Sequence, residues 1–475
     1  MRKNGYKGYD YDGGGIYISN SSAINLTNVS ISGNECYNNG GGIYISDTSA
    51  INMTNIMVSN NYSDSGGGIY IDHSVEVNLN NIYISENDGG GIYISNGSKI
   101  NLKNVNVSEN KNVRNGGGIY ISNSSVENII NGTISGNESK CKYYCYNCNG
   151  GGLYIEQFSS VNLTNVDIIA NRTSSDQASC EANGGGLHIS ANSTISLANV
   201  VISENIAFSK NYDAKGGGIY LGWGSNIIFN NKKRCNIFFN KANYGNDIYN
   251  DNYFKKIELV LDTFSVLSPR NYFAHPIENY SFDILNGKIE QINSELYVSP
   301  NGDDTNIGNA TEYPLKHINY AIAIIKASKN KQGIIHLDEG TYSLDNTEEI
   351  FPIVLSSYIK IKGKNTETTK LDAQQSDRVF YLKKVSDFNI ESVLIYNGYS
   401  EEGGGILITE KSIGNLLNVT ISNNKGKDGG GIYISDASAV DLTNVNITEN
   451  MASTSGGGIY ISDCSISLAN VNRPT

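Results

Sequence analysis

The sequence predicts an all-β protein that folds as a parallel β-helix. Three glycines followed by an aliphatic residue recur along the chain, and successive blocks lie 23 to 34 residues apart, a period typical of solenoids. Within each repeat, apolar and polar residues alternate with a period of two, and Ile, Val, Tyr, Thr, Asn and Ser favour strands and turns. The blocks begin at residues 13, 40, 66, 89, 116, 150, 184, 216, 403, 429 and 456.

The repeat from Gly13 to Asn39 shows how one coil would form. Its aliphatic residues predict three short strands per coil, with about six side chains pointing inward. Burying these yields roughly 1.5–3 kcal/mol each, whereas ordering the backbone costs about 1–2 kcal/mol per residue. A single coil is therefore unstable alone, and we expect each strand to pair in parallel with its equivalents about 4.8 Å above and below.

Stacking of this kind predicts columns of identical residues. We expect an outward aromatic column interrupted by His188, and columns of Asn that bond to one another at turns, where Asn tolerates a left-handed backbone. The aromatic column comprises Tyr17, Tyr44, Tyr70, Tyr93, Tyr120, Tyr154 and Tyr220. The two Asn columns comprise Asn28, Asn55, Asn81, Asn104, Asn131, Asn165 and Asn199, and Asn34, Asn61, Asn87, Asn110, Asn137, Asn171 and Asn205.

The pairing of Gly-Gly-Gly-Ile (Gly40 to Ile43) with Ile-x-x-Asn (Ile84 to Asn87) resembles the repeat of polymorphic outer-membrane proteins, whose motifs are GGAI and FxxN. Here Gly replaces the Ala, and Ile or Val mostly replaces the Phe. More broadly, the chain resembles the pectate-lyase-like superfamily of right-handed β-helices. That resemblance implies a right-handed parallel β-helix; enzymes, adhesins and spike proteins all share this scaffold, so it does not fix an activity.

The repeats form two arrays, because the pattern decays after Gly216 and resumes at Gly403. Residues 1–262 form the first array, 263–294 a linker, and 295–475 the second array. Residues 295–345 resemble the opening of pectate-lyase-like proteins, with a helix over 315–328 that places Ile318, Ile322 and Ile325 on one face. This cap would cover the apolar end of the second array.

Both termini interrupt the pattern: a regular coil begins twelve residues after Met1, and the sequence stops within a coil at Thr475. We interpret the chain as a fragment of a longer tandem protein that is exported to the extracellular space or cell surface. The net charge of −12, without a basic cluster, excludes nucleic acid as a partner. No apolar run reaches the roughly 18 residues of a membrane-spanning helix, so we expect no membrane insertion of this segment.

Catalytic residues on a β-helix would come from neighbouring coils in register. In the outward column of the third strand, Asp167 has no carboxylate neighbour. This column contains Ser30, Met57, Tyr83, Asn106, Thr133, Asp167 and Val201. Hydrolases need paired carboxylates, and the Gly-His-Gly and Arg-Ile-Lys motifs of polygalacturonases are missing. No catalytic constellation emerges, and the five histidines share no spacing that suggests a site.

No cofactor is required, and an acidic column in the second array is a candidate for binding Ca²⁺. Glu410, Asp436 and Asp463 occupy the same position of three successive coils. Because like charges about 5 Å apart repel, they form either a solvated turn or a Ca²⁺ site.

Three stacked insertions are the second candidate for function, because solenoids place binding surfaces on such loops. They cover Glu138–Asn149, Arg172–Asn183 and Ala207–Lys215. They contain Cys141, Cys145, Cys148 and Cys180, which form either disulfides or free thiols, or else a Zn²⁺ site.

The leading functional hypothesis is a non-enzymatic, surface-exposed β-helix protein that uses its Tyr and Asn columns for adhesion or contact with carbohydrate or a host-cell ligand. A polysaccharide lyase or hydrolase on the same scaffold is one alternative. A structural spacer within a larger tandem-repeat protein is the other.

Overall fold

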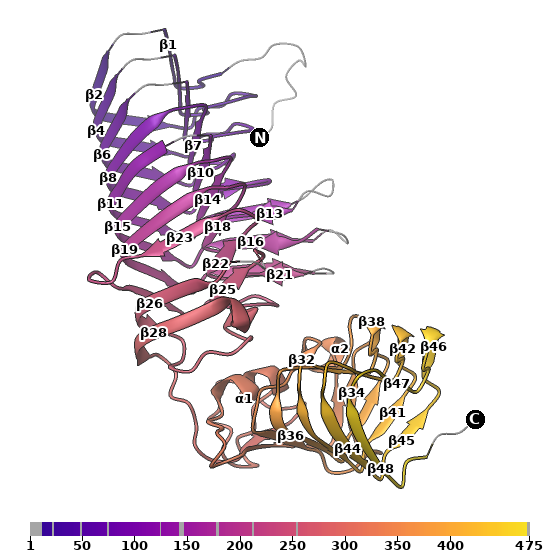
Figure 1. Ribbon diagram of the computed structural model, residues 1–475. Helices are drawn as coiled ribbons and strands as arrows, with labels where there is room; N and C mark the ends of the chain where they lie inside the picture. Colours follow the sequence, from indigo (N-terminus) through magenta and orange to yellow (C-terminus); the bar gives the residue numbers. More distant parts are fainter. Residues whose placement is uncertain are drawn as a thin grey trace. The chain divides into compact units, whose positions relative to one another are not determined.

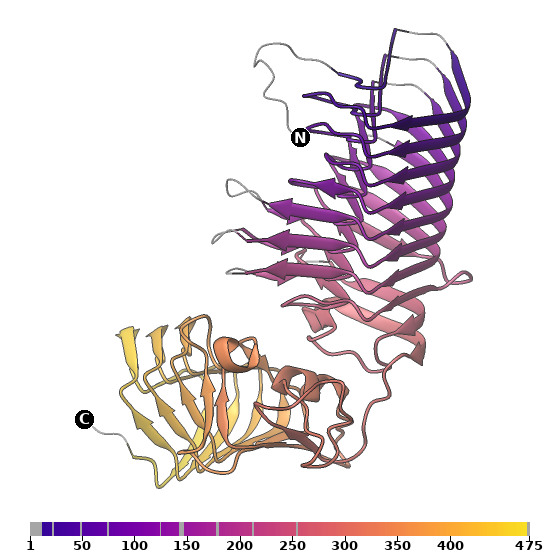
Figure 2. The same ribbon diagram turned by 180° about the vertical axis from the view of Figure 1, so that it is seen from behind.

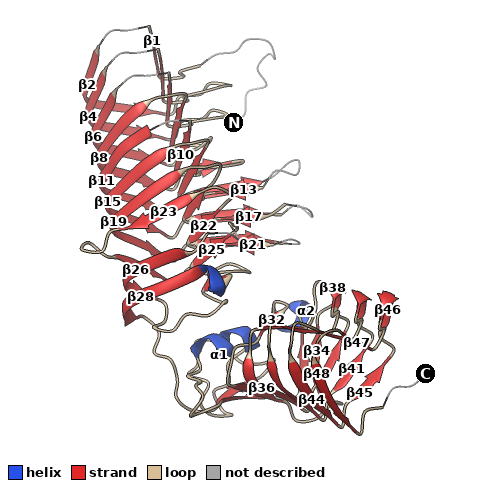
Figure 3. Ribbon diagram, viewed as in Figure 1, coloured by secondary structure: helices blue, strands red, loops and turns tan. Residues whose placement is uncertain are grey.

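The computed structural model describes residues 12–20, 23–47, 50–73, 76–123, 125–141, 147–176, 180–210, 213–252 and 255–472. Short parallel strands dominate it, and helices are limited to brief segments (Figure 3). The chain divides into two compact units, Met1–Lys288 and Ile289–Thr475, and each is a parallel β-solenoid (Figure 1). The predicted fold class is therefore confirmed.

The strands that follow the glycine blocks stack into a ten-stranded sheet in the first unit (Figures 1 and 2). Ile43 pairs with Ile16 on one side and Ile69 on the other, so equivalent residues of successive coils are vertical neighbours. The strands are β1 (Ile16–Ser19), β3 (Ile43–Ser46), β5 (Ile69–Asp72), β7 (Ile92–Ser95), β10 (Ile119–Ser122), β14 (Leu153–Glu156), β18 (Leu187–Ile189), β22 (Ile219–Leu221), β25 (Ile248–Asn250) and β27 (Ala274–His275).

The second and third predicted strands of each coil merge into one in most of the first unit. Strand β2 runs without interruption from Ile24 to Ser32, because Asn28 adopts a left-handed backbone (φ 56°) that bends the strand without ending it. An eleven-stranded sheet results, and the expectation of three separate strands is wrong for this unit. Its strands are β2, β4 (Ile51–Ser59), β6 (Val77–Ser85), β8 (Lys99–Ser108), β11 (Ser125–Ser135), β15 (Ser160–Ile169), β19 (Thr194–Ser203), β23 (Asn226–Phe229), β24 (Cys235–Phe238), β26 (Ile257–Phe264) and β28 (Tyr280–Gly287).

The three stacked insertions form small parallel sheets of their own rather than loops alone. Both sheets follow the coil repeat, since each strand pairs with its equivalent one coil away. The first contains β9 (Lys111–Asn112), β12 (Glu138–Cys141), β16 (Arg172–Ser175) and β20 (Ile206–Ser209). The second contains β13 (Cys148–Asn149), β17 (Ala182–Asn183) and β21 (Ala214–Lys215).

Most of the predicted linker belongs to the first unit. Strand β28 pairs with β26 over its length, β27 pairs with β25, and a 3₁₀ helix, Ile277–Asn279, lies between β27 and β28. Alternating apolar residues of this stretch, such as Tyr280, are buried although the glycine block is absent. The boundary between the units falls between Lys288 and Ile289.

The second unit keeps three separate strands per coil around one apolar core. Its largest sheet contains β29 (Leu296–Val298), β30 (Gly333–Leu337), β33 (Ile359–Lys362), β36 (Ser386–Glu391), β40 (Ile413–Leu417), β44 (Ala439–Thr443) and β48 (Ser465–Ala469). The two five-stranded sheets contain β31 (Gly340–Tyr342), β34 (Thr369–Asp372), β37 (Leu394–Tyr396), β41 (Thr420–Ser422) and β45 (Asn446–Thr448), and β32 (Ile353–Val354), β35 (Phe380–Lys383), β39 (Ile406–Thr409), β43 (Ile432–Ile434) and β47 (Ile459–Ile461). The smallest contains β38 (Tyr399–Glu402), β42 (Lys425–Asp428) and β46 (Met451–Ser455).

The predicted helix exists as α1 (Ile318–Ile324), and a second short helix, α2 (Leu344–Thr347), follows β31. The expected apolar face is buried, because Ile318, Ile322 and Ile325 are at most 3% exposed. Glu349 accepts hydrogen bonds from the backbone N–H groups of Ile318 (2.6 Å) and Asn319 (3.2 Å) at the start of α1. These bonds satisfy donors that a helix leaves without partners in its first turn.

A buried ladder of Asn side chains closes the coils of the first unit. Asn137, which is 0% exposed, accepts bonds from both the backbone N–H and the side-chain amide of Asn110 (3.0 Å each). Its own amide donates to the Val107 carbonyl (2.9 Å) and to Asn171 Oδ1 (2.9 Å). Each Asn therefore links the coil before it to the coil after it. The same pattern connects Asn34, Asn61, Asn87, Asn110, Asn137, Asn171, Asn205 and Asn240.

This ladder explains the glycine block. In the coil of Asn137, a Cβ on Gly118 would lie 2.5 Å from the Gly152 carbonyl and 3.0 Å from the Asn137 amide. A Cβ on Gly117 would lie 2.6 Å from the Glu138 carbonyl, and Gly116 has φ +64°. The beginning and end of each coil thus meet so closely that no side chain fits between them.

We predict that Asn137→Ala destabilises the first unit far more than Asn131→Ala. The first substitution leaves buried partners of Asn137 unsatisfied, at about 1–3 kcal/mol per group, so we expect the free energy of unfolding to fall by about 3 kcal/mol. Asn131 belongs to the exposed ladder, and we expect its loss to cost about 1 kcal/mol, mainly because Ala tolerates the left-handed backbone poorly. Urea unfolding of the two variants measures the difference, and equal losses would contradict the role of the buried ladder.

The buried ladder ends on a carboxylate. Asp247, which is 0% exposed, accepts bonds at Oδ1 from the backbone N–H (3.3 Å) and the amide (3.0 Å) of Asn240. Burial raises the pKa of Asp247 to about 7, although bonds from Ser265 and Asn240 act in the opposite direction.

We predict that Asp247 makes the first unit less stable as pH rises. Because its pKa in the folded chain lies above its ordinary value, its stabilising contribution is complete below pH of about 4 and is lost as pH rises through about 7. Asp247→Asn removes this titration, so the variant should match the parent at pH 4 and exceed its Tm at pH 8. Thermal unfolding followed across this range provides the measurement, and parallel Tm profiles would refute the prediction.

Candidate functional site

The predicted aromatic column exists, and its rings stack on one another. Successive centroids from Tyr17 to Tyr120 lie 5.1, 5.5, 4.6 and 4.4 Å apart, with interplanar angles of at most 12°. His188 occupies its predicted place between Tyr154 and Tyr220, and the column continues through Tyr249 to His275. From Tyr17 to Tyr120 the ring faces therefore contact neighbouring rings, which leaves ring edges and hydroxyl groups for any other partner. From Tyr120 to Tyr220 the rings meet at interplanar angles of 34° to 69°.

The column is exposed at one end and buried at the other. Tyr17 is 56% exposed, whereas Tyr154 and Tyr220 are 5% and 7% exposed. Burial begins where the insertions do, since β13, β17 and β21 end just before the coils of Tyr154, His188 and Tyr220. Burial raises the pKa of Tyr154 and lowers that of His188 to about 3, so both groups stay neutral near pH 7. We conclude that the column mainly stabilises the solenoid.

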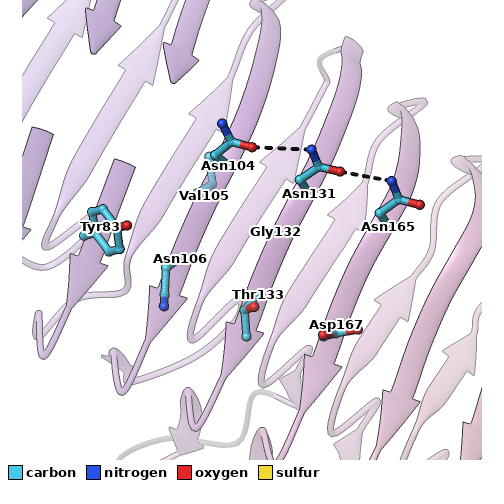
Figure 4. A pocket seen from close by; sticks show the side chains of 9 residues that line it. All are labelled: Tyr83, Asn104, Val105, Asn106, Asn131, Gly132, Thr133, Asn165 and Asp167. Atoms are coloured by element: carbon cyan, nitrogen blue, oxygen red, sulfur yellow. Dashed lines mark hydrogen bonds between the residues drawn. The ribbon is translucent and has the colours of Figure 1, made fainter. Parts of the chain in front are cut away.

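A shallow open groove lies instead on the eleven-stranded sheet, across β6, β8, β11 and β15. Its volume is about 360 Å³. Figure 4 shows two rows of side chains with Val105 and Gly132 between them. One row is the exposed Asn ladder, in which Asn131 donates to Asn104 (3.4 Å) and Asn165 donates to Asn131 (3.0 Å). The other row contains Tyr83, Asn106, Thr133 and Asp167, which are outward neighbours on successive strands.

Tyr83 is the aromatic residue of the groove, and it differs from the stacked column. Its side chain is 55% exposed, and its neighbours in register are Met57 and Asn106. Neither neighbour is aromatic, so the faces of the Tyr83 ring are not stacked within its column. A ring of this kind can contact the apolar face of a sugar, while its hydroxyl can bond to solvent or ligand.

Gly132 interrupts a row of aliphatic residues beneath the groove. Its neighbours in register are Val105 and Val166, so the wall of the solenoid lacks one side chain at this point. The sequence already contained this signal, because the other coils carry Val or Ile after the Asn of the exposed ladder. The sequence analysis searched the column of Asp167 for carboxylates alone. It therefore missed the isolated Tyr83 in that column and Gly132 in the neighbouring one.

Asp167 is the carboxylate of the groove. Its neighbours in register are Thr133 and Val201, as the sequence predicted. Glycoside hydrolysis in most families requires two carboxyl groups on opposite sides of the bond. The groove therefore offers hydroxyl, amide and aromatic groups with one negative charge, a set suited to hydrogen bonding rather than to acid–base pairs.

Two residues of the acidic column in the second array bond to neighbouring side chains. Glu410 forms an ion pair with Lys383 (3.2 Å), and Asp436 accepts a bond from Ser435 (3.1 Å). Glu410, Asp436 and Asp463 all adopt φ near 50°, as residues of a tight turn do. Among the residues that the structure describes, no three His, Cys, Asp or Glu side chains are grouped so that they could hold a metal ion. Calcium binding at this column stays a prediction.

The cysteine cluster separates in the structure. Cys141 and Cys148 form a disulfide, in agreement with the first of the two interpretations of the cluster. Cys180 is buried one coil away, and its carbonyl accepts a bond from Ser209 (3.0 Å). Cys145 lies outside the described residues.

Comparison with known proteins gives limited information on function. Residues 300–472 match a family model described as "Protein of unknown function (DUF1565)". No curated protein matches the chain. In the part of the chain that the structure describes, no helix is long and apolar enough to cross a membrane.

Two solved structures of the PL6 family alginate lyase AlyGC are among those that match. A mutant form is 10% identical, with a TM-score of 0.23, and the match covers 93% of this chain and 78% of the lyase. The other form is 9% identical, with a TM-score of 0.19 and coverage of 97% and 78%. At these values neither lyase informs the activity of this chain. The fold, a parallel β-solenoid, rests on the strand pairing described above.

We predict that two tyrosine substitutions differ strongly in their effect on the free energy of unfolding. Tyr93 stacks on both sides, so Tyr93→Ala should lower the free energy of unfolding by about 2 kcal/mol, since each aromatic pair contributes about 0.5–1.5 kcal/mol beyond burial. Tyr83→Ala removes an exposed side chain and should change stability by less than about 0.5 kcal/mol. Chemical denaturation of both variants tests this division, which fails if Tyr83→Ala proves the more damaging.

Proposed function

We propose that this chain is a non-enzymatic, exported β-helix protein that binds carbohydrate through the groove of its first unit and thereby serves in adhesion. The observation that carries the proposal is the groove itself, in which the unstacked ring of Tyr83 lies beside a row of amide groups. Sugars present both apolar faces and hydroxyl groups, and this combination complements both. The rigid scaffold holds the groove in a fixed geometry, which reduces the entropic cost of binding.

The disulfide supports export. Disulfides persist in oxidising compartments and are rare in the cytosol, where thiols are kept reduced. The bond between Cys141 and Cys148 lies in the first of the three stacked insertions, beside the solenoid wall. An adhesive protein of the cell exterior would meet such conditions.

The groove chemistry favours binding over turnover. Asp167 lies between Thr133 and Val201, so its own column does not supply the second carboxylate that a hydrolase requires. Repeated amides and hydroxyls along the solenoid axis suit a ligand that is itself extended and repetitive.

We expect Tyr83→Ala to weaken carbohydrate binding by about tenfold, because one aromatic contact of roughly 1.4 kcal/mol is lost. The experiment is a glycan array with the full chain, followed by affinity electrophoresis of the parent and the variant in each polysaccharide retained. Tyr313→Ala, which removes a tyrosine that is 63% exposed in the second unit, is the matched control and should bind as the parent does. The proposal fails if the parent binds no glycan, or if Tyr83→Ala leaves the binding unchanged.

A polysaccharide lyase is the second candidate, and one column of the second unit favours it. Tyr297, His336, Lys362 and Glu391 are neighbours in register on successive strands, and the rings of Tyr297 and His336 stack with centroids 4.9 Å apart. The Nε2 atom of His336 also lies within hydrogen-bond distance (2.7 Å) of Glu295 Oε2. Tyr, His and Lys are the residue types that exchange protons in eliminations. Unsaturated products released from uronic-acid polymers in the same binding experiment would favour this candidate.

A further inference from the structure

The exposed Asn ladder extends well beyond the groove that it borders. Each side-chain amide donates to the Oδ1 atom of the preceding Asn, over distances of 2.9 to 3.4 Å. The ladder comprises Asn28, Asn55, Asn81, Asn104, Asn131, Asn165 and Asn199, which all have φ between 53° and 58°. The groove includes Asn104, Asn131 and Asn165 (Figure 4), so the other members of the ladder lie outside it.

The ladder presents the same hydrogen-bonding groups once per coil. An Asn amide has two N–H donors and an oxygen with two lone pairs, and the ladder uses one of each. In the part of the chain that the structure describes, Asn104 alone uses its second N–H, which bonds to Asn80 (3.4 Å). The other positions between the two ends of the ladder retain one donor and one lone pair, and their side chains are exposed or half-buried.

The repeat distance of these groups is set by amide stacking. The ladder shares the coil spacing of about 4.8 Å, because in strands and in Asn ladders alike one amide donates to the oxygen of the next. Another material built from stacked amides has nearly the same repeat, since the same N–H···O distance fixes it. Its groups stay in register with the ladder over many coils, whereas a surface with another repeat loses register within a few.

The charges beside the ladder favour an uncharged partner. In the two outward columns that flank it from β2 to β19, the charged residues are Lys103 and Asp167, which have opposite signs. An acidic polymer or an anionic lipid surface therefore meets no excess of cations here, on a chain whose net charge is −12. A row of amides also lacks the continuous apolar patch that an apolar partner requires.

We infer that the exposed ladder binds crystalline chitin, an insoluble and uncharged polymer of N-acetylated sugars. In such crystals, neighbouring chains stack through N–H···O=C bonds between their acetamide groups, so a row of acetamides has the chemistry of the ladder and nearly its repeat. The unused N–H of each ladder Asn donates to an acetamide oxygen, and the unused lone pair accepts a bond from a sugar hydroxyl. Each bond is weak, but bonds in register add, because the first contact brings the others within reach.

This inference rests on the carbohydrate-binding function proposed above and names the class of polymer, which the groove alone does not define. Sedimentation of the full chain with crystalline chitin is the test, with microcrystalline cellulose and amorphous reprecipitated chitin as comparisons. We expect at least tenfold tighter binding to crystalline chitin, because cellulose lacks amides and amorphous chitin lacks a regular repeat. Equal affinity for the three materials, or no binding to crystalline chitin, overturns the inference.

The double variant Asn55→Gly/Asn81→Gly removes two amides of the ladder outside the groove. Gly adopts the left-handed backbone of both positions readily, so the variant should retain the fold. We expect its affinity for crystalline chitin to fall by about thirtyfold, since two amides no longer contribute. Asn60→Gly/Asn123→Gly is the matched control and should bind as the parent does, because both residues are exposed and left-handed but belong to no ladder.

Urea unfolding of both double variants shows whether they fold equally well. If the ladder variant is the less stable, the single variant Asn55→Gly replaces it, with an expected loss of about fivefold. Unchanged affinity in the ladder variant overturns the inference.

Tyr83→Ala separates the ladder from the groove. Binding to crystalline chitin that persists in Tyr83→Ala and falls in the ladder variant supports the inference. Binding that falls in Tyr83→Ala and persists in the ladder variant assigns chitin to the groove and overturns it. Retention of soluble glycans that depends on Tyr83, without binding to crystalline chitin, also overturns it and leaves the function proposed for the groove intact.

Discussion

The closure of each coil by a buried Asn side chain is the constraint on which the first unit depends. At this point the chain completes one turn, and strand hydrogen bonds cannot satisfy all of the backbone groups that meet there. Asn137 supplies one acceptor and two donated bonds at this position and thereby joins three successive coils. The glycine block follows from it, because Gly117 and Gly118 pack against the turn that Asn137 begins. The glycine block and the recurring Asn, which are the two most conspicuous features of the sequence, thus form the two sides of one contact.

The same closure leaves the rest of the coil open to variation. The insertions enter between the Asn turn and the next glycine block, so they extend the coil without disturbing the contact between the two. There they form small sheets that bury the aromatic column from Tyr154 onward. A second point of variation is the turn before the eleven-stranded sheet, where Phe158 and Trp223 replace small or polar residues. The solenoid therefore places its unusual residues where the closure does not constrain them.

Much of this fold can be predicted from the sequence, because every repeat shows the same pattern of strand, turn and buried residues. The strand register, the aromatic column with His188 in it, both Asn columns and the helix at Ile318 all follow from periodicity. Residues 263–287 were less readable, since β27 and β28 lack the glycine block and contribute through buried residues such as Tyr280. The merging of two strands at Asn28 also eluded prediction, because a single left-handed residue can either end a strand or only bend it.

The candidate site was less predictable than the fold. A column of tyrosines suggests a surface for sugars, but the close spacing of the coils makes the rings contact one another first. Tyr83 keeps its faces because its neighbours in register are Met57 and Asn106, as the periodicity of the repeat had already indicated. The groove also depends on the missing side chain of Gly132, whose effect emerges only when the adjacent strands are in place.

The Asn side-chain bonds of the first unit run in two opposite directions along the solenoid axis. In the buried ladder every side-chain amide points its donor toward the C-terminal neighbour, as from Asn61 to Asn87, so the dipoles add along the axis. In the exposed ladders the donors point the opposite way, as from Asn81 to Asn55 and from Asn78 to Asn52. The antiparallel strings oppose one another, much as adjacent helix dipoles do when helices pack in opposite directions. Each coil added to a solenoid of this design therefore adds side-chain dipoles of both directions along its axis.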